Sequence, residues 1–268
     1  MKMLRCSSLL VAMILAFSSC GIFEDREGCP CWLTFFFDNE TELSDDVSVY
    51  AVNSSGGKGF DAAIDIEGIE EGSELEVMRD TYRCSLFSGI RECIKEGMIM
   101  LIPENCQADR LFLYTCDVDC NGEFAEERVE MKKEWTTVKI SFENDSKVEE
   151  SVVTEGISIV ISSDVCGVDL LSGEPVIGSY RFIPILEDNS FSFRLLRHSY
   201  GTDRLVADIY YDSQLIDSFH LGNALDQINY DWNEPHLSDV FMSFDLEKSE
   251  AFIKVVPWTG FDQEHVIF

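Results

Sequence analysis

The chain has 268 residues, of which 50 are acidic and 20 are basic, so its formal net charge is −30. Hydrophobic residues make up 46% of the sequence, which is enough to form a core and excludes a wholly disordered chain. Phosphate binding needs basic patches, so we expect no nucleic-acid partner. The length suits one large domain or two of ordinary size.

The first twenty residues have the layout of a secretory signal. Lys2 and Arg5 come first, an apolar run covers residues 9–17, and two serines precede Cys20. The apolar run is too short to span a bilayer, which needs roughly 20 residues. A cysteine directly after two small residues resembles a bacterial lipobox, in which the thiol is acylated and becomes the first residue of the mature protein.

We therefore expect a signal peptide at residues 1–19, lipidation of Cys20 and a tether at residues 20–30. The alternative is an ordinary signal peptide with a chance cysteine. Removing residues 1–19 takes away two basic residues and no acidic one, so the net charge becomes −32. The acidic cluster at residues 24–27 is similar to the surface-export signal of lipoproteins from Bacteroidetes-type bacteria. The mature protein is predicted to be held by lipid at the outer membrane, on the cell surface.

Eight cysteines remain beyond the signal and the lipid site: Cys29, Cys31, Cys84, Cys93, Cys106, Cys116, Cys120 and Cys166. An exported chain can form disulfides, and the candidate local pairs are Cys84 with Cys93, and Cys106 with Cys116 or Cys120. The alternative is that the thiols stay free and fill the core, and spacing cannot decide between the two. No C-x-x-C motif is present, so neither a zinc ribbon nor a thioredoxin motif is predicted.

Strand signals dominate the rest of the chain. Segments rich in β-branched and aromatic residues predict strands at Trp32–Phe37, Val47–Val52, Thr81–Phe87, Leu111–Cys116, Thr136–Phe142, Ile157–Ser162, Phe191–Leu196, Leu205–Tyr211, Asp239–Leu246 and Ala251–Val256. One short helix is expected at Leu221–Ile228.

Strict alternation marks several of these strands as half-buried. In the segment Thr136–Phe142, for example, Val138, Ile140 and Phe142 share one face. Turn signals between such strands and the lack of a long amphipathic helix predict an all-β fold of β-sandwich type. The polar segment 143–150 is the expected boundary, which gives β-sandwich domains at residues 31–145 and 146–268.

A metal-binding pattern occurs once. Asp117, Asp119, Asn121 and Gly122 match the first half of a calcium loop, whose alternate oxygen side chains wrap a cation. The position that should supply a bidentate Glu is Arg128, however, and the segment before the motif is typical of a strand. A β-hairpin with a two-residue turn at Asn121 and Gly122 is therefore the favoured interpretation, and no metal site is expected.

Catalytic patterns are absent: there is no G-x-S-x-G, no H-E-x-x-H and no glycine-rich loop that opens a helix. We expect no enzymatic activity, no cofactor and no small-molecule substrate. Some aromatic residues could form a sugar-binding platform, although alternating strand positions favour core packing for most of them. These residues are Phe35, Phe37, Trp135, Tyr210, Trp232 and Trp258.

Several features together resemble a known family. Cys20 is followed by Cys29-Pro30 and then directly by the strand Trp32–Phe37. Near the end come the segments Tyr230–Trp232 and Asp239–Leu246, and the last predicted strand leads into Val255-Val-Pro-Trp-Thr. This layout resembles the FimB-like fimbrial anchor subunits of Bacteroidetes-type bacteria, within the fimbrillin superfamily. The cysteines between Cys84 and Cys120 depart from that pattern.

The resemblance implies two tandem transthyretin-like or Ig-like β-sandwich domains in a lipidated surface protein. It implies an anchor at the fimbrial base, whose partners are fimbrial shaft subunits and the outer membrane. Related pili polymerise by strand exchange, a form of β-augmentation. The segment Ala251–Phe268 is the candidate strand for that pairing, and an ordinary core strand is the alternative. A surface lipoprotein that binds glycans or host molecules is the alternative function.

Overall fold

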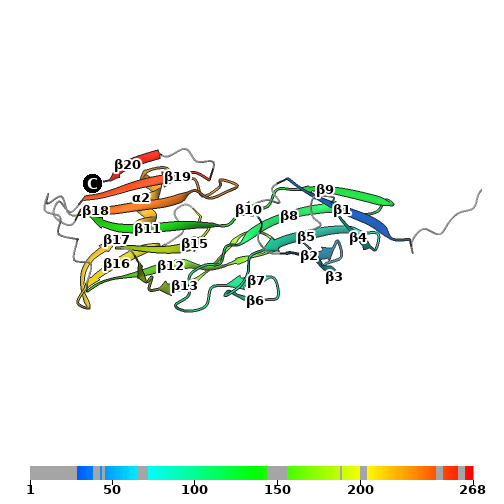
Figure 1. Cartoon of the computed structure of the whole chain (residues 1–268). Coiled ribbons are helices and arrows are strands. Elements are labelled where there is room, and N and C mark those ends of the chain that lie inside the picture. The colour runs from blue at the N-terminus through cyan, green and yellow to red at the C-terminus, as the bar shows by residue number, and fades with distance from the viewer. Residues whose placement is uncertain are drawn as a thin grey trace, which may run out of the picture.

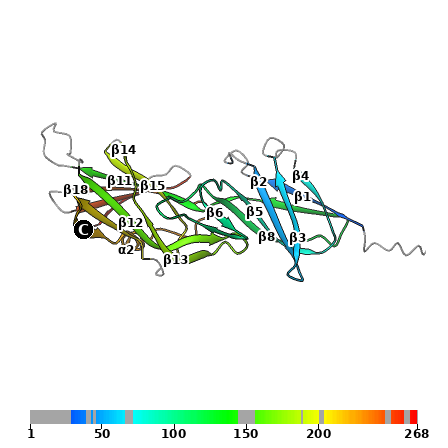
Figure 2. The same ribbon diagram turned by 90° about the horizontal axis from the view of Figure 1, so that it is seen from below.

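The computed structural model describes residues 29–38, 43, 46–65, 72–143, 156–187, 189–199, 204–245, 250–258 and 263–267. These residues form β-strands almost throughout, with one helix, α2 (Leu221–Gln227), so the predicted all-β fold is confirmed. The strands build two lobes in an elongated molecule (Figure 1; Figure 2 gives a second view). In this part of the chain no helix is long and apolar enough to cross a membrane.

The first domain is a sandwich of two sheets. The smaller sheet has the order β4 (Ser73–Val77), β1 (Cys31–Phe37), β9 (Phe124–Val129), with β1 antiparallel to β4 and parallel to β9. The larger sheet has the order β10 (Lys132–Lys133), β8 (Phe112–Asp119), β5 (Thr81–Ser88), β2 (Val47–Asn53), β3 (Lys58–Ile64).

Alternation along β1 explains how this sandwich closes. Leu33 and Phe35 are fully buried between the sheets, whereas Trp32 and Phe36 on the same strand are exposed. The period of two therefore sends every second side chain into the core, as the sequence predicted. Inward-facing residues of β2, β5 and β8 complete the same cluster.

The second domain is built from two larger sheets. One has the order β14 (Leu186–Glu187), β15 (Ser190–Leu196), β11 (Trp135–Glu143), β18 (Asp239–Asp245), β19 (Glu250–Val256), β20 (Gln263–Ile267). The other has the order β17 (Gln214–Phe219), β16 (Val206–Tyr211), β12 (Ile157–Asp169), β7 (Ile99–Leu101), β6 (Ile94–Glu96), and β13 (Pro175–Phe182) also pairs with β12.

The helix α2 packs against the core of the second domain, close to the predicted position. Its buried side chains are Leu221, Ala224 and Leu225, at the i, i+3, i+4 spacing that puts them on one face. The chain then enters the core again with Tyr230 and Trp232, whose rings meet edge to face with centroids 4.7 Å apart.

The boundary between the domains is not the predicted segment 143–150. The strand β11, which precedes that segment, pairs with β15 and β18 of the second domain, and its buried residues Val138, Ile140 and Phe142 lie in the second core. The change of domain falls between β10 and β11, at Glu134. Alternation identifies a half-buried strand but does not say which sheet receives it, which is why the prediction was wrong.

A second crossing interlocks the domains. The strands β6 and β7 lie between β5 and β8 in the sequence, yet β7 pairs with β12 of the second domain. Met100 of β7 is fully buried in the second core. The backbone of β12 approaches so closely that a Cβ at Gly167 would lie 2.1 Å from the Met100 carbonyl oxygen, so only glycine fits there.

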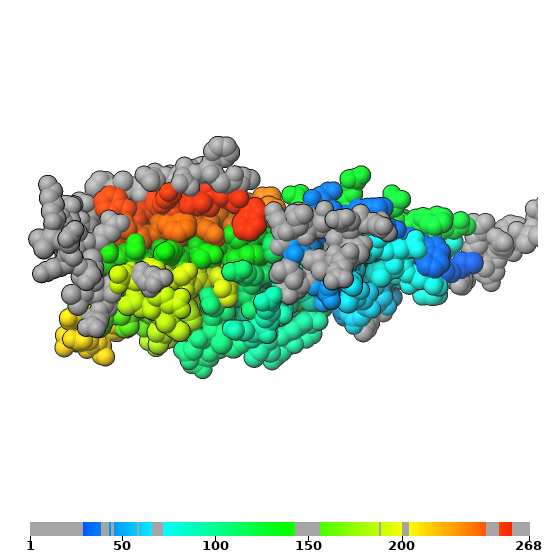
Figure 3. Space-filling model, viewed as in Figure 1, coloured from blue at the N-terminus to red at the C-terminus, as the bar shows by residue number. Residues whose placement is uncertain are grey.

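Contacts between the lobes extend beyond these strands. The Ser85 hydroxyl donates to the Leu170 carbonyl oxygen at 2.5 Å, and Arg83 Nε donates to the Leu171 carbonyl oxygen at 3.3 Å. Phe87 and Leu113 of the first domain belong to the core cluster of the second. The space-filling view shows a continuous surface across this junction (Figure 3). The two domains therefore form one packed unit and not two units joined by a linker.

Candidate strand-pairing site

The C-terminal strand β20 is the edge of its sheet. It pairs antiparallel with β19, with Phe252 opposite Val266 and Lys254 opposite Glu264. No other strand of the described residues pairs with the outer side of β20. A row of backbone N–H and C=O groups on such an edge can pair with an added strand.

The strand β19 is an inner strand, paired on both sides by β18 and β20. Its Ile253 and Val255 are buried, whereas Phe252, Lys254 and Val256 lie on the half-exposed face. The candidate segment Ala251–Phe268 is thus divided. Its first part is a core strand, which was the alternative interpretation, and only β20 lies at an edge where an added strand could pair.

The hairpin of β16 and β17 forms a second edge in the same domain. The side chains of β17 are exposed except for Phe219, and Leu215 and Ile216 are each 55% exposed. In Figure 1 this hairpin and the C-terminus lie at one end of the molecule, and the chain enters β1 at the other. Among the described strands, the sheet edges β17 and β20 are therefore far from the start of β1.

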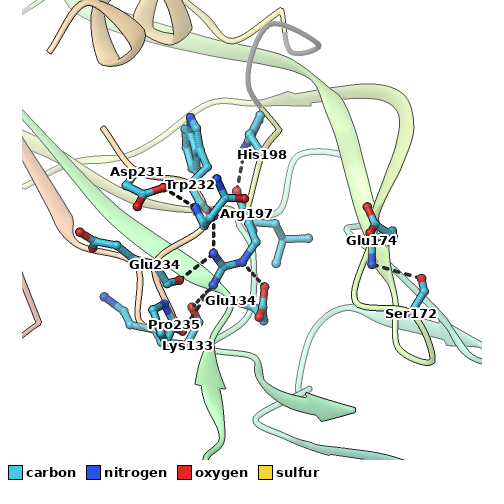
Figure 4. A network of polar contacts seen from close by, with 12 residues as sticks. Lys133, Glu134, Ser172, Glu174, Arg197, His198, Asp231, Trp232, Glu234 and Pro235 are labelled. Atoms are coloured by element: carbon cyan, nitrogen blue, oxygen red, sulfur yellow. Dashed lines mark hydrogen bonds and ion pairs between the residues drawn. The ribbon is translucent and has the colours of Figure 1, made fainter. Parts of the chain in front are cut away.

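Arg197 is the centre of a polar network at the junction of the domains (Figure 4). Its Nε donates to Glu134 Oε2 at 2.6 Å, and its Nη1 donates to the carbonyl oxygens of Trp232 and Glu234. Its Nη2 donates to the Lys133 carbonyl oxygen at 3.2 Å. One guanidinium thereby holds the start of β11 against the loop that precedes β18.

Burial shapes the electrostatics of this network. It raises the pKa of the Glu134 carboxyl above its ordinary value, and the Arg197 guanidinium opposes part of that rise. The adjacent pocket has a volume of about 210 Å³, and its lining includes Glu134 and Arg197 of the network together with Thr115 and Ser172. We interpret the network as structural, because the Nε, Nη1 and Nη2 donors of Arg197 are all directed at protein oxygens that join β11 to the loop before β18.

Lys133 extends the network toward the strand edge. Its ammonium group is buried and lies 2.8 Å from both the Asp239 carboxylate and the Leu237 carbonyl oxygen. It also lies 4.5 Å from the ring centroid of Trp258, which follows β19. The same Asp239 carboxylate accepts the Thr137 N–H at 2.8 Å. A buried cation therefore ties β10, β18 and the end of β19 together.

The structure brings together a serine and a histidine that the sequence analysis did not connect. Ser163 donates to His198 Nε2 at 2.7 Å, because His198 Nδ1 must donate to the Leu196 carbonyl oxygen at 2.7 Å. Both side chains are buried, and the histidine ring packs against Trp232. Burial lowers the pKa of His198 to about 4, so the ring is neutral near pH 7. This geometry is that of a hydrogen bond that satisfies two buried polar side chains in the core.

The candidate calcium motif forms a turn. Asp119 Oδ1 accepts the backbone N–H of Asn121 at 3.0 Å and its side-chain Nδ2 at 2.6 Å. Asp117 forms an ion pair with Arg83 at 3.3 Å. The prediction that this turn closes a β-hairpin was wrong, because β8 and β9 belong to opposite sheets. Within the described residues no group of three or more His, Cys, Asp or Glu is placed to hold a metal.

The cysteine pairs suggested by spacing are not those that the structure brings together. Cys84 lies in the first core and Cys93 in the second, while Cys84 faces Cys116 across β5 and β8. Cys120 lies beside Cys31. The eight described cysteines are all free thiols in the structure. Cys20, the predicted lipidation site, lies outside the described residues.

Most of the aromatic candidates for a sugar platform are core residues. Phe35, Phe37, Trp135 and Trp232 are buried, whereas Tyr210 is half-buried and Trp258 is 41% exposed. An exposed set that the sequence analysis did not single out lies on the outer face of the small sheet. There Trp32 faces Phe124 across β1 and β9, with Phe36 further along β1.

No protein-family model matches the sequence, and no curated protein matches it. Solved structures do match. A Bacteroides thetaiotaomicron protein of the DUF1812 group, described provisionally as polysaccharide-binding, has a TM-score of 0.68 at 13% identity, over 90% of this chain and 98% of that one. A Bacteroides ovatus protein described provisionally as an adhesin has a TM-score of 0.65 at 14% identity, over 92% and 97%. The fimbrial anchor protein Mfa2 from Porphyromonas gingivalis has a TM-score of 0.60 at 12% identity, over 89% and 99%.

These likenesses span nearly the whole length of each pair of chains, so they concern both domains and their arrangement. At such low identity they show the fold and nothing finer. The resemblance indicated by the sequence is confirmed at that level: the chain has the tandem β-sandwich fold of the fimbrial anchor protein Mfa2 and of the two Bacteroides proteins.

Proposed function

We propose that the chain is a surface lipoprotein of a fimbrium, an anchor or accessory subunit that attaches the filament to the outer membrane. The observation that carries the proposal is β20, whose outer side is paired by no described strand, in a chain that has the fold of a fimbrial anchor protein. The proposed role is structural, without catalysis, cofactor or small-molecule substrate.

The proposed contact is β-augmentation by a shaft subunit. Backbone hydrogen bonds to an added strand give strength, and alternate side chains that fill pockets give specificity. The position of β20 suits this role, because it lies far from the N-terminal end of β1 in Figure 1. A lipid at Cys20 and a filament at β20 would then act at opposite ends of one packed unit.

The lipid anchor is tested by Cys20→Ala. This variant is expected to release both the protein and its filaments into the medium, because acylation holds them at the membrane. The matched control is Cys29→Ala, which removes an exposed thiol nine residues later and should leave retention unchanged. Filaments that stay on cells bearing Cys20→Ala would contradict the anchor role.

The strand role is tested by deleting residues 261–268. The truncated protein should fold and be lipidated, because β19 and its buried residues remain, and it should no longer retain fimbriae. Unchanged retention would exclude β20 as the contact. The fold of the variant is checked by circular dichroism, and retention by counting filaments on cells.

A cross-link separates two forms of the contact. Lys254→Cys with Glu264→Cys places two thiols at facing positions of β19 and β20. A disulfide there would fix β20 to its own sheet. Retention that survives oxidation indicates that the shaft subunit adds to the outer side of β20, whereas retention lost on oxidation and restored by reduction indicates that β20 leaves its sheet.

Glycan binding is the second candidate function. It is favoured by the exposed neighbours Trp32 and Phe124, whose apolar faces could stack on sugar rings. A glycan array should then give a signal that the double variant Trp32→Ala, Phe124→Ala abolishes and that Met78→Ala, an exposed apolar control, leaves intact. No binding to any glycan on the array would remove this candidate.

A further inference from the structure

Four buried cysteines gather in the core of the first domain, close to the point where the tether enters. Cys31, Cys84 and Cys120 are fully buried and Cys116 is 8% exposed. All four belong to the core cluster between the two sheets. Buried thiols can serve as small apolar fillers, so the question is how they are paired.

Cys84 and Cys116 are directly opposite each other. They are register partners of the antiparallel strands β5 and β8, and both side chains face the core. Facing residues of an antiparallel pair have Cα atoms roughly 4.5–5.5 Å apart, within the range of roughly 4.4–6.8 Å that disulfides span. The Cys84 and Cys116 thiols are in hydrogen-bond contact.

Cys31 and Cys120 form a second contact, this time between the sheets. Cys31 opens β1 in the small sheet, and Cys120 directly follows β8 in the large one. Their thiols are also in hydrogen-bond contact. Cys93 and Cys106 lie near each other in the second core, and the other two described cysteines differ from the four of the first core. Cys29 is exposed, and the Cys166 thiol donates to the Val176 carbonyl oxygen at 3.6 Å.

We propose that the mature protein carries two disulfides, Cys84–Cys116 and Cys31–Cys120, formed by thiol–disulfide exchange during export. In each, two thiols lose two protons and two electrons, and one S–S bond forms. The oxidant is the disulfide of a thiol oxidase in the compartment beyond the inner membrane, which is reduced to a dithiol through a mixed-disulfide intermediate. The proposal rests on the export of the chain that the proposed function requires.

The environment of the thiols indicates when the exchange occurs. Burial and the neighbouring Cys31 thiol raise the pKa of Cys120 to about 12. The hydrogen bond with Cys84, together with burial, raises the pKa of Cys116. Thiolate is the attacking species, so these groups are unreactive once the sandwich has closed. Oxidation therefore accompanies folding and precedes burial.

The two bonds have a mechanical consequence. A filament that pulls against the lipid loads the tether first and then β1, the strand that follows it. Cys31–Cys120 ties β1 to the end of β8 in the opposite sheet, and Cys84–Cys116 ties β8 to β5. The load would then pass through covalent bonds into the middle of the first domain.

Peptide mapping of protein isolated from cell membranes tests the pairing. The sample is denatured and treated with iodoacetamide without reductant. Cys31, Cys84, Cys116 and Cys120 should resist labelling until reductant is added, and the linked peptides should join Cys84 to Cys116 and Cys31 to Cys120. Labelling of these four without reductant would overturn the proposal, and so would linkage of Cys84 to Cys93.

Single cysteine variants distinguish a disulfide from two free thiols that merely pack together. Cys84→Ala should make Cys116 available to iodoacetamide without reductant, whereas the control Cys166→Ala should not. The urea midpoint of Cys84→Ala should match that of the double variant with Cys116→Ala, because either change removes the same bond. Additive losses in the double variant would indicate separate packing of two free thiols and would overturn the proposal.

The same preparation separates this inference from the proposed function. If protease removes the protein from intact cells but its four thiols are labelled directly, the disulfides are excluded and the surface role stands. If the linked peptides are found but Cys20→Ala still retains filaments, the disulfides stand and the anchor role fails.

Discussion

At the scale of single residues, the buried Ser163–His198 pair shows how the core treats a titratable group. Both ring nitrogens are in hydrogen bonds, and the ring has its ordinary pKa of 6.5 lowered to about 4 by burial. Between pH 6.5 and about 4, His198 is therefore protonated in the unfolded chain and neutral in the folded chain. Stability must fall as the pH drops through that window.

This linkage gives a measurable pH dependence. As the pH falls from about 6.5 to about 4, His198 should cost the protein roughly 3 kcal/mol of stability, at roughly 1.4 kcal/mol per pH unit. Urea titrations across this range should show the loss, and His198→Gln should flatten it. The control His220→Gln, at an exposed position, should keep the full dependence. An unchanged pH dependence in His198→Gln would contradict the assignment.

At the scale of elements, the β7–β12 contact controls how the domains interlock. A methyl group at Gly167 would collide with the Met100 carbonyl oxygen, which is backbone and cannot move aside. Gly167→Ala should therefore separate β7 from β12 and destabilise the protein by about 1–3 kcal/mol. Amide hydrogen exchange at residues 99–101 should become faster. Gly57→Ala is the control, because its Cβ would meet only the side chain of Asn53. Protection at residues 99–101 that survives the substitution would contradict this role.

Local pattern located ten strands but missed others, such as β3, β9 and β13, and it did not predict which strands pair. The alternation of Val138, Ile140 and Phe142 correctly identified the buried face of β11, because that face depends on a period of two along one strand. The choice of sheet depends on long-range contacts, so β11 was assigned to the wrong domain. The short strands β6 and β7 were missed for the same reason, since three residues carry no recognisable period.

The candidate site was predictable to a similar extent. The sequence analysis proposed the C-terminal segment as a pairing strand, but it could not separate the inner strand β19 from the edge strand β20. Nor could it place Cys31 beside Cys120, because these residues meet only when β1 packs over the end of β8. The sequence predicted a turn at Asn121-Gly122, but it did not predict that this turn connects strands of two different sheets.

At the scale of the whole molecule, two crossings make the domains interdependent. The second domain takes β11 and the β6–β7 pair from the first half of the chain, and the cores meet at Phe87 and Leu113. Such an arrangement would carry a load from β1 to the edge strand β20 without a flexible linker between the domains. It also means that neither half of the sequence contains a complete domain.

Two fragments test this interdependence. Residues 146–268 lack β11, β6 and β7, and residues 31–145 carry these strands without their partners. Neither fragment should give a cooperative urea transition by circular dichroism, whereas the chain without residues 1–19 should unfold in a single step. A cooperative transition in either fragment, or two separate steps in the longer chain, would show that the domains are independent.

The most direct test of the anchor role is the position of the protein along the filament. Immunogold labelling of intact cells and of detached fimbriae, with antibody against this chain, measures that position. We expect gold at the base of the filaments, on the outer membrane. Gold at the tips would contradict the anchor role while keeping a fimbrial one, and gold on cells without any association with filaments would contradict both.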